Sequence, residues 1–424
     1  GGSANQTLTV DKSAMRVKAD ILEAFPEVTV KRTDDLMTVL VRIASQTEER
    51  FIFIIDEWDA ICREFDPKSQ VMKQYFDWLR KMFKSSQAMG VFAGVYMTGI
   101  LPIKKYNTQS ALNNFIEYSV VKPFNMSGFF GFTKEEVKSL AKTHDMNYED
   151  LENWYDGYMI GDEKSIFNPN SVMLSVMSRT CENYWSQTAA YDAIVPYIKM
   201  NYDTLKDDII RMLAGGRCRV DPSGFQNDLS IIRSKDDVLT VLIHLGYLAY
   251  EEDEEMCYIP NREIHKEWQN AVSDNADYGE TNKIIANSKN LLRETLAGNE
   301  DAVARALDIS HMHVTSNRSY NNEYSLQSAI YLAYIYALNG YVIEKEATAG
   351  KGFADIVYIP FDKTKAAMIV ELKHNKSAAT ALNQIKEKEY FQCLANWQGE
   401  LLFVGINYDE KTKKHECKIE RFMK

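Results

Sequence analysis

The last hundred residues contain an ordered succession of helix-like and strand-like segments, which limits the fold more than any other feature of the chain. An apolar helical pattern over 326–339 ends at Gly340. Strand-like runs follow at 341–346, 353–360 and 366–372, then a polar helical pattern at 377–395 and a strand-like run at 400–407. The order α-β-β-β-α-β over about 100 residues is enough for a self-contained α/β domain.

Glu371 and Lys373 place opposite charges at the end of the third of these strands. Alternate side chains of a strand share a face, so both point the same way while Leu372 packs behind them. On the preceding strand, Asp355 interrupts an apolar pattern. If the two strands pair, Asp355 lies beside Glu371. Two neighbouring carboxylates repel each other unless a cation lies between them.

This pattern indicates a site for a hard divalent cation. Mg²⁺ is bound by one or two carboxylates, and waters and substrate phosphate oxygens complete its octahedron. Such an ion acidifies a bound water and offsets charge on a reacting phosphate. A lysine beside it would orient the attacking water or stabilise the transition state. A Glu-x-Lys triplet at a strand end can equally be a solvent-exposed ion pair, and that alternative stays open.

The segment resembles the PD-(D/E)XK nuclease superfamily, in which an acidic residue on one strand precedes (D/E)-x-K on the next within an αβββαβ core. Asp355 followed by Glu371, Leu372 and Lys373 matches this signature. The resemblance implies that Asp355 and Glu371 bind Mg²⁺ or Mn²⁺ and that Lys373 is the catalytic cation.

Two further residues match positions that some members of the superfamily use. Glu323, at the start of the first helix, corresponds to an additional metal ligand, and Gln384, in the later helix, corresponds to a polar residue that supports the catalytic site. The resemblance as a whole implies a metal-dependent nuclease that hydrolyses phosphodiester bonds of nucleic acid. DNA is the expected polymer.

The strongest strand signal of the N-terminal part is Phe51–Ile55, a continuous apolar run typical of a strand that is buried on both faces in a parallel sheet. A helical pattern and a second apolar run follow within residues 70–100, which predicts a β-α-β unit. Asp56 and Glu57 come directly after the first strand, and Thr98 ends the second. Nucleotide hydrolases use carboxylates in this place to hold Mg²⁺ and to polarise water. The acids can instead cap the next helix.

Seven short motifs make the chain similar, from about residue 35, to a bacterial family that combines an AAA-ATPase-like domain with a C-terminal PD-(D/E)XK nuclease domain. The resemblance implies that Asp56, Glu57 and Thr98 belong to a nucleotide-binding site, with Thr98 in the place of the sensor residue. The motifs, in order, are FIIDEWDAI, YMTGILPI, SALNNF, GFFGFTKEEV, WYDGY, FNPNSV and NYW.

The expected architecture is α/β with three parts. Thr133 followed by Glu136 is a capping box, which predicts a helix there and begins a region of helical patterns. The parts are an AAA-like parallel-sheet domain over residues 1–130, a helical middle region over 131–315, and a restriction-endonuclease-like αβββαβ domain over 316–424.

The phosphate loop of AAA-type ATPases, G-x-x-x-x-G-K-[ST], is absent from the sequence. The Gly350-Lys351 pair has no glycine five residues earlier, is followed by Gly352, and lies in the wrong domain. Without loop amides and a lysine to hold the phosphates, tight ATP binding is not expected. Either the natural protein has an upstream loop, in which case ATP is a cofactor, or this domain is structural.

Composition limits the class of protein. A net charge of −11 disfavours a chain that coats nucleic acid or an anionic membrane, although residues 319–424 are near neutral and an anionic polymer can approach them. Six cysteines without a C-x-x-C pair indicate reduced thiols and a cytoplasmic protein. No apolar run reaches the length of a membrane helix, so no membrane partner is expected. Homo-oligomerisation is compatible with an AAA-like domain.

Two other functions remain open at this point. One is a nucleotide-gated switch whose nuclease-like domain only binds nucleic acid or a protein. The other is an interaction module without either chemistry. His311 and His313 have metal-like spacing, but such a pair arises easily by chance in a chain with seven histidines. His374 follows Lys373, and we interpret it as a packing residue.

Overall fold

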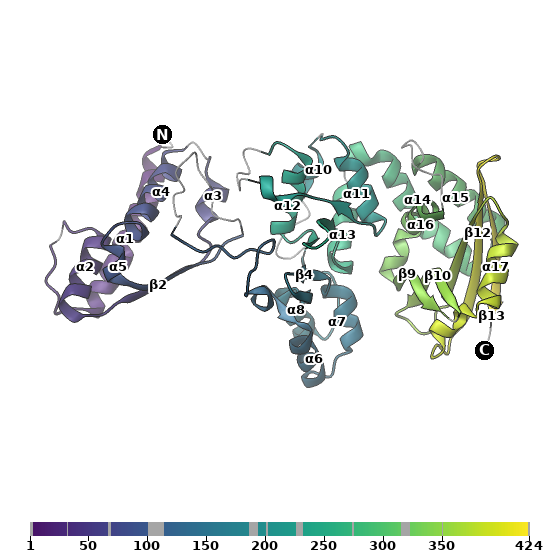
Figure 1. Ribbon diagram of the computed structural model, residues 1–424, viewed down its shortest axis with the longest axis horizontal. Coiled ribbons are helices and arrows are strands. Elements are labelled where there is room, and N and C mark those ends of the chain that lie inside the picture. Colours follow the sequence, from purple (N-terminus) through teal and green to yellow (C-terminus); the bar gives the residue numbers. More distant parts are fainter. Residues whose placement is uncertain are drawn as a thin grey trace. The chain divides into compact units, whose positions relative to one another are not determined.

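The computed structural model describes residues 3–31, 33–66, 69–100, 114–185, 194–200, 202–225, 232–273, 275–314, 323–349 and 351–422. Contacts within the chain divide it into two compact units (Figure 1). One unit comprises residues 1–123 and 222–245, and the other comprises residues 124–221 and 246–424. The boundaries expected at residues 130 and 315 remain predictions.

The first unit is built around two parallel strands. β1 (Phe51–Ile55) pairs with β2 (Phe92–Met97), and α4 (Gln70–Phe83) lies between them in sequence, so the β-α-β order is confirmed. Ser69 caps α4 by accepting a hydrogen bond from Met72 N at 3.3 Å. The other helices are α1 (Ser3–Ala24), α2 (Leu36–Thr47), α3 (Ala60–Glu64), α5 (Ala88–Val91), η3 (Pro222–Gly224) and α12 (Lys235–His244).

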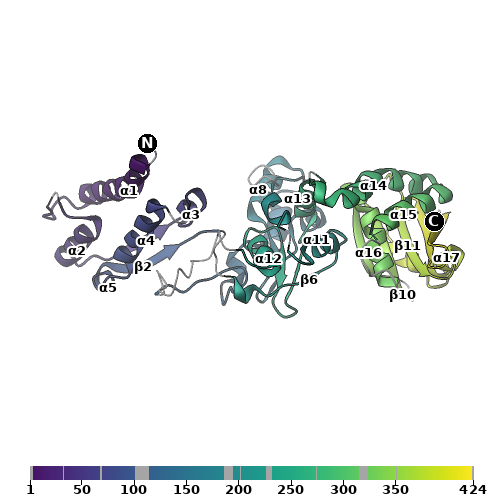
Figure 2. The ribbon, with the colours of Figure 1, turned by 90° about the horizontal axis from the view of Figure 1, so that it is seen from above.

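One face of this strand pair packs against a core, and its side chains are half-buried. Phe51, Phe53 and Ile55 pack into the core formed with α2, α4 and α5, which Figure 2 shows beside β2. Ile52 and Ile54 point to the opposite face and are 72% and 69% exposed. The expectation that the run is buried on both faces is therefore wrong. The reason is that alternate side chains point to opposite faces, and the core packs against one of them.

The second unit begins with short elements around the predicted capping box, which the structure confirms: Thr133 N donates to Glu136 Oε2 at 2.8 Å and α6 follows. Besides the expected helices, this part contains two small antiparallel sheets, β3-β5-β4 and β6-β8-β7, whose strands of two to five residues are too short for a periodic signal. The elements are η1 (Ser127–Phe129), β3 (Phe132–Thr133), α6 (Lys134–Thr143), α7 (Tyr148–Tyr155), β4 (Tyr158–Ile160), β5 (Glu163–Phe167), α8 (Pro169–Ser178), α10 (Val195–Ile198), α11 (Leu205–Leu213), β6 (Cys218–Arg219), β7 (Ala249–Glu251), β8 (Met256–Tyr258), α13 (Arg262–Ser273) and η4 (Ala276–Tyr278).

Helix α13 carries two buried carboxylates, Glu263 and Glu267. Glu263 Oε1 accepts hydrogen bonds from Ser171 Oγ at 3.0 Å, Tyr184 N at 2.8 Å and Trp185 N at 2.9 Å. Burial raises the pKa of Glu263 to about 7, and the negative charge of Glu267 adds to the rise. Ionising Glu263 is therefore unfavourable in the folded protein.

The C-terminal part is a five-stranded sheet with helices on both faces (Figures 1 and 2). Its elements are α14 (Gly279–Ala297), α15 (Glu300–Val314), α16 (Glu323–Ala333), η5 (Ile335–Asn339), β9 (Tyr341–Ala349), β10 (Gly352–Pro360), β11 (Ala367–His374), α17 (Ala378–Glu387), η6 (Tyr390–Leu394), β12 (Leu401–Asp409) and β13 (Lys414–Phe422). The strand order is β13-β12-β11-β10-β9, with β11 and β12 parallel and the other pairs antiparallel.

The α-β-β-β-α-β order is confirmed, with three differences. The first helix changes to the 3₁₀ helix η5 after Ala333, and the later helix ends at Glu387, before Glu389 takes a left-handed backbone with φ 56°. β13 adds an edge strand that the sequence analysis missed. Helices α14 and α15, which precede residue 316, contribute to the core on one face of this sheet, and α17 covers the other.

Gly405 allows α17 to approach the sheet. A Cβ at this position would lie 2.3 Å from Ala378 O and 2.9 Å from Leu382 N, which are main-chain atoms of α17. Gly405 lies beside Glu371 in the parallel β11–β12 ladder. This close approach explains the glycine in a strand interior, and it sets the distance between α17 and the strand that carries Glu371.

We predict that Gly405→Ala lowers the free energy of unfolding by roughly 1–3 kcal/mol, because the added methyl group forces α17 away from the sheet. Urea denaturation followed by circular dichroism measures the change. Gly340→Ala is the matched control, since only Lys365 Nζ, at 3.9 Å, lies near its Cβ position. Equal stability of the two variants would contradict the packing argument.

We predict that Glu263→Gln increases stability more at pH 8 than at pH 5. The folded-state pKa is about 7 against an ordinary value of 4.5, so stability is lost as the pH rises from about 4.5 through 7. The variant cannot ionise and should gain about 1–3 kcal/mol over the parent at pH 8. Unfolding free energies at both pH values test this, and a difference between variant and parent that does not change with pH would refute it.

Candidate active site

Asp355 and Glu371 meet across the antiparallel strands β10 and β11. Ile356 pairs with Val370, so the next position along both strands sets Asp355 opposite Glu371. Leu372 N donates a hydrogen bond to Asp355 Oδ2 at 2.7 Å, which holds this carboxylate against β11. Burial, followed by the negative charge of Asp355, raises the pKa of Glu371. The structure therefore brings the two predicted carboxylates together.

Lys373 lies on the same face as Glu371 and forms an ion pair with it. Its Nζ donates to Glu371 Oε1 at 2.8 Å and to Leu372 O at 2.9 Å. The Lys373 and Glu371 side chains are only 7% and 2% exposed. The alternative of a solvent-exposed pair is excluded by this burial. Because desolvating two charges costs several kcal/mol per ion, a buried pair is weak support for stability.

Gln384 joins the cluster from α17. Its Nε2 donates to Glu371 Oε1 and, at 3.0 Å, to Tyr390 Oη. Glu371 Oε1 thus accepts from both Lys373 and Gln384. Tyr390 is buried, and a Cβ at Gly352 would lie 3.3 Å from its hydroxyl. The start of β10 is therefore packed against the residues that hold Glu371.

The remaining oxygen of Glu371 suits a divalent cation. Glu371 Oε2 is buried and has no hydrogen-bond partner among the residues that the structure describes. Asp355 is adjacent, and carboxylate oxygens are the ligands that Mg²⁺ prefers. Within the described part of the chain no cluster of three or more His, Cys, Asp or Glu could hold a metal ion. The described residues thus offer two carboxylates at this place, which fits an ion that keeps several waters.

Glu323 begins α16, but its side chain lies outside the described residues. The same is true of the side chains of His311 and His313 in α15. His374 is described: its ring centroid lies 5.9 Å from that of Tyr408, a residue of the core on the face away from Gln384. It therefore packs on the opposite side of the sheet from the carboxylates.

Sequence reasoning missed three residues that shape this site: Gly405, Tyr390 and Asn407. An isolated glycine inside an apolar strand is a known sign of close backbone approach, so Gly405 could have been found. Asn407 lies beside Lys373 in the parallel ladder, is buried, and accepts a hydrogen bond from Lys376 N at 2.9 Å. It closes the turn between β11 and α17. No pattern in the sequence distinguishes Tyr390 from a core aromatic.

In the N-terminal part, Asp56 and Glu57 lie beside Thr98, which the sequence places at the end of the neighbouring strand. Thr98 Oγ1 donates to Asp56 Oδ1, and Glu57 N donates to Thr98 Oγ1 at 3.3 Å. Thr98 N donates to Ile55 O at 2.9 Å, which extends the pairing of β1 and β2 to this point. The residue before α3 is Asp59, and its side chain forms no capping hydrogen bond. The acids at 56 and 57 lie between the end of β1 and this N-cap residue.

The comparisons with known proteins concern the C-terminal sheet. Residues 321–418 match the PD-(D/E)XK nuclease superfamily. No curated protein and no solved structure gives a significant match to the chain. None of the described helices has the length and apolar character needed to span a membrane. The matched range contains Asp355, Glu371, Lys373 and Gln384, and the structure supplies the sheet and flanking helices around them. The C-terminal part of this chain, residues 321–418, is a PD-(D/E)XK nuclease superfamily domain.

Proposed function

We propose that the protein is a metal-dependent nuclease that hydrolyses phosphodiester bonds of nucleic acid, with DNA as the substrate. The observation that carries the proposal is the buried pair of Glu371 and Lys373 with the half-buried Asp355 beside it, in which Glu371 Oε2 has no hydrogen-bond partner among the described residues. The superfamily match supports the reaction class, because a nuclease domain acts on nucleic acid.

Asp355 and Glu371 would hold Mg²⁺ or Mn²⁺, and the ion would supply an acidified water and offset charge on the scissile phosphate. Lys373 contributes a compact positive charge beside the carboxylates, which would stabilise negative charge as it develops on the phosphate. Gln384 orients Glu371 by donating to Oε1 and leaves Oε2 for the metal. Burial strengthens each of these interactions, because water screens them less.

We further propose that the N-terminal part is an AAA-ATPase-like domain, in which Asp56, Glu57 and Thr98 form a nucleotide site that ATP occupies only if the natural protein has an upstream phosphate loop. The hydrogen bonds that join these residues support this assignment. They also favour the second candidate function, a nucleotide-gated switch whose nuclease-like domain binds nucleic acid or a protein without cutting it. A cytoplasmic location and homo-oligomerisation belong to the same proposal.

We expect Lys373→Met to lower the rate of Mg²⁺-dependent DNA cleavage at least about 100-fold, because a similar volume is kept while the positive charge is lost. Supercoiled plasmid, linear duplex, single-stranded DNA and RNA should be tested with Mg²⁺ and Mn²⁺. Lys386→Met is the control, since this lysine of α17 is exposed and pairs with Glu420. Cleavage by Lys373→Met that equals cleavage by the parent would refute the proposed catalytic role.

We expect Asp355→Asn to abolish Mg²⁺ binding measured by calorimetry, because the site loses one of its two negative charges. The asparagine oxygen can still accept the hydrogen bond from Leu372 N, so folding should be preserved. Asp362→Asn, an exposed carboxylate near the end of β10 that accepts from Thr364 Oγ1, should bind Mg²⁺ like the parent. Binding that survives Asp355→Asn, or is missing from the parent, would favour an interaction module without a metal site.

A further inference from the structure

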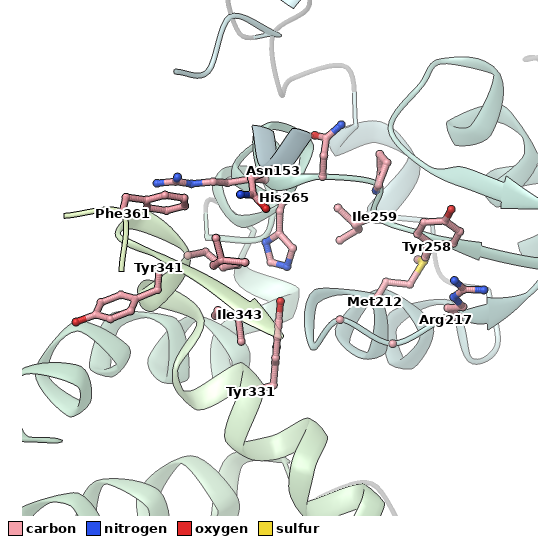
Figure 3. A pocket seen from close by; sticks show the side chains of 17 residues that line it. Asn153, Met212, Arg217, Tyr258, Ile259, His265, Tyr331, Tyr341, Ile343 and Phe361 are labelled. Atoms are coloured by element: carbon pink, nitrogen blue, oxygen red, sulfur yellow. The ribbon is translucent and has the colours of Figure 1, made fainter. Parts of the chain in front are cut away.

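A cavity lies in the same unit as the carboxylate site, and none of Asp355, Glu371 and Lys373 lines it. Its volume is about 330 Å³, at the lower end of the range of roughly 300–1,000 Å³ for small-molecule sites. In the view of Figure 3, Phe361 and Tyr258 lie at opposite ends, with His265 between them. The walls come from the segment after α11, from β8 and α13, and from α16, β9 and the residue after β10. A small ligand is therefore the expected occupant.

Arg262 is the unusual residue of this cavity. Its guanidinium lies between two aromatic rings, 4.0 Å from the Trp154 centroid and 4.2 Å from the Phe361 centroid. Its Nε is buried without a hydrogen-bond partner, and no ion pair of Arg262 is found among the described residues. Burial lowers the pKa of Arg262 to about 10, with Asp150 opposing this shift through space. The guanidinium is partly removed from water and has no bonded counter-ion among the described residues, so a bound anion would supply one.

The rest of the lining also favours an anion. The chain has an excess of acidic residues, yet none of the 17 residues around the cavity is Asp or Glu. Arg217 lies at the other end, 4.6 Å from the Tyr258 centroid, and its charge is balanced by Glu251 and Glu254 outside the lining. Arg262 is thus the cation that an incoming negative group would meet.

The cavity also offers flat surfaces. The rings of Tyr258, Tyr331 and Phe361 face it, and Figure 3 shows Tyr331 extending toward His265. His265 is held by Leu213 O at 3.0 Å and by Gln269 Nε2 at 3.1 Å, and burial lowers its pKa to about 4, so it is neutral. Aromatic faces bind planar rings by stacking.

We propose that this cavity is a binding site for a nucleoside monophosphate, with the phosphate at Arg262 and the base among the aromatic side chains. A guanidinium fork matches phosphate oxygens, and a planar base matches the rings. The proposal does not depend on nuclease activity. Lys345 of β9 donates a hydrogen bond from Nζ to Ala214 O, directly after α11, and lies 4.2 Å from the Tyr331 centroid. These contacts connect the elements that form the Tyr331 wall of the cavity.

The test is calorimetric titration of the full chain with AMP, GMP, CMP and UMP, alongside adenosine and inorganic phosphate. We expect at least one monophosphate to bind at one site per chain, with the free nucleoside and phosphate at least about tenfold weaker. Arg262→Gln should weaken binding at least about tenfold, because the charged phosphate contacts are lost. Arg293→Gln, an exposed arginine of α14 that pairs with Glu294, should leave the affinity unchanged.

A second variant tests the site independently in case Arg262→Gln does not fold. Ile259→Trp narrows the cavity without changing any charge, and it should also weaken binding at least about tenfold. The proposal is overturned if no monophosphate binds at concentrations up to about 1 mM. It is equally overturned if adenosine binds as tightly as AMP, or if the folded Arg262→Gln and Ile259→Trp variants bind like the parent.

Discussion

The buried contact between Lys373 and Glu371, with Asp355 beside it, is the interaction on which the candidate site of the C-terminal domain depends. Two acids and one base lie close together on the face of the sheet that α17 covers. Removing charges from water costs more than a surface ion pair returns, so this arrangement does little for stability. It does provide a carboxylate oxygen, Glu371 Oε2, that is ready for a cation.

Strand pairing and the close approach of α17 place the side chains of the candidate site. Antiparallel pairing of β10 and β11 sets Asp355 opposite Glu371, and strand alternation sets Lys373 on the same face. The parallel step from β11 to β12 requires a crossover, which α17 provides, and Gly405 lets that helix come close. As a result Gln384 reaches Glu371 from the helix. Sheet pairing and one glycine thus determine the geometry of the site.

Much of this domain could be predicted from the sequence, because the strands of the core are long apolar runs and their charged interruptions are few. Asp355 and Glu371 were found in this way, Gln384 was found through the resemblance to the superfamily, and the structure brings all three together. Prediction failed where the sequence carries no periodic signal. Strands β3 to β8 are too short to show an alternation of apolar and polar residues, and Tyr390 cannot be told from a core aromatic by its sequence context. At β1, an apolar run suggested burial on both faces, but periodicity cannot tell whether a second layer covers Ile52.

The most direct test of the metal site is a crystal structure of the protein with Mn²⁺, in which anomalous scattering locates the ion independently of any activity. The account predicts one ion bound by both Asp355 and Glu371, and no ion there in crystals of Asp355→Asn. Saturating Mn²⁺ that leaves these two carboxylates without an ion, or an ion that contacts neither of them, would contradict it.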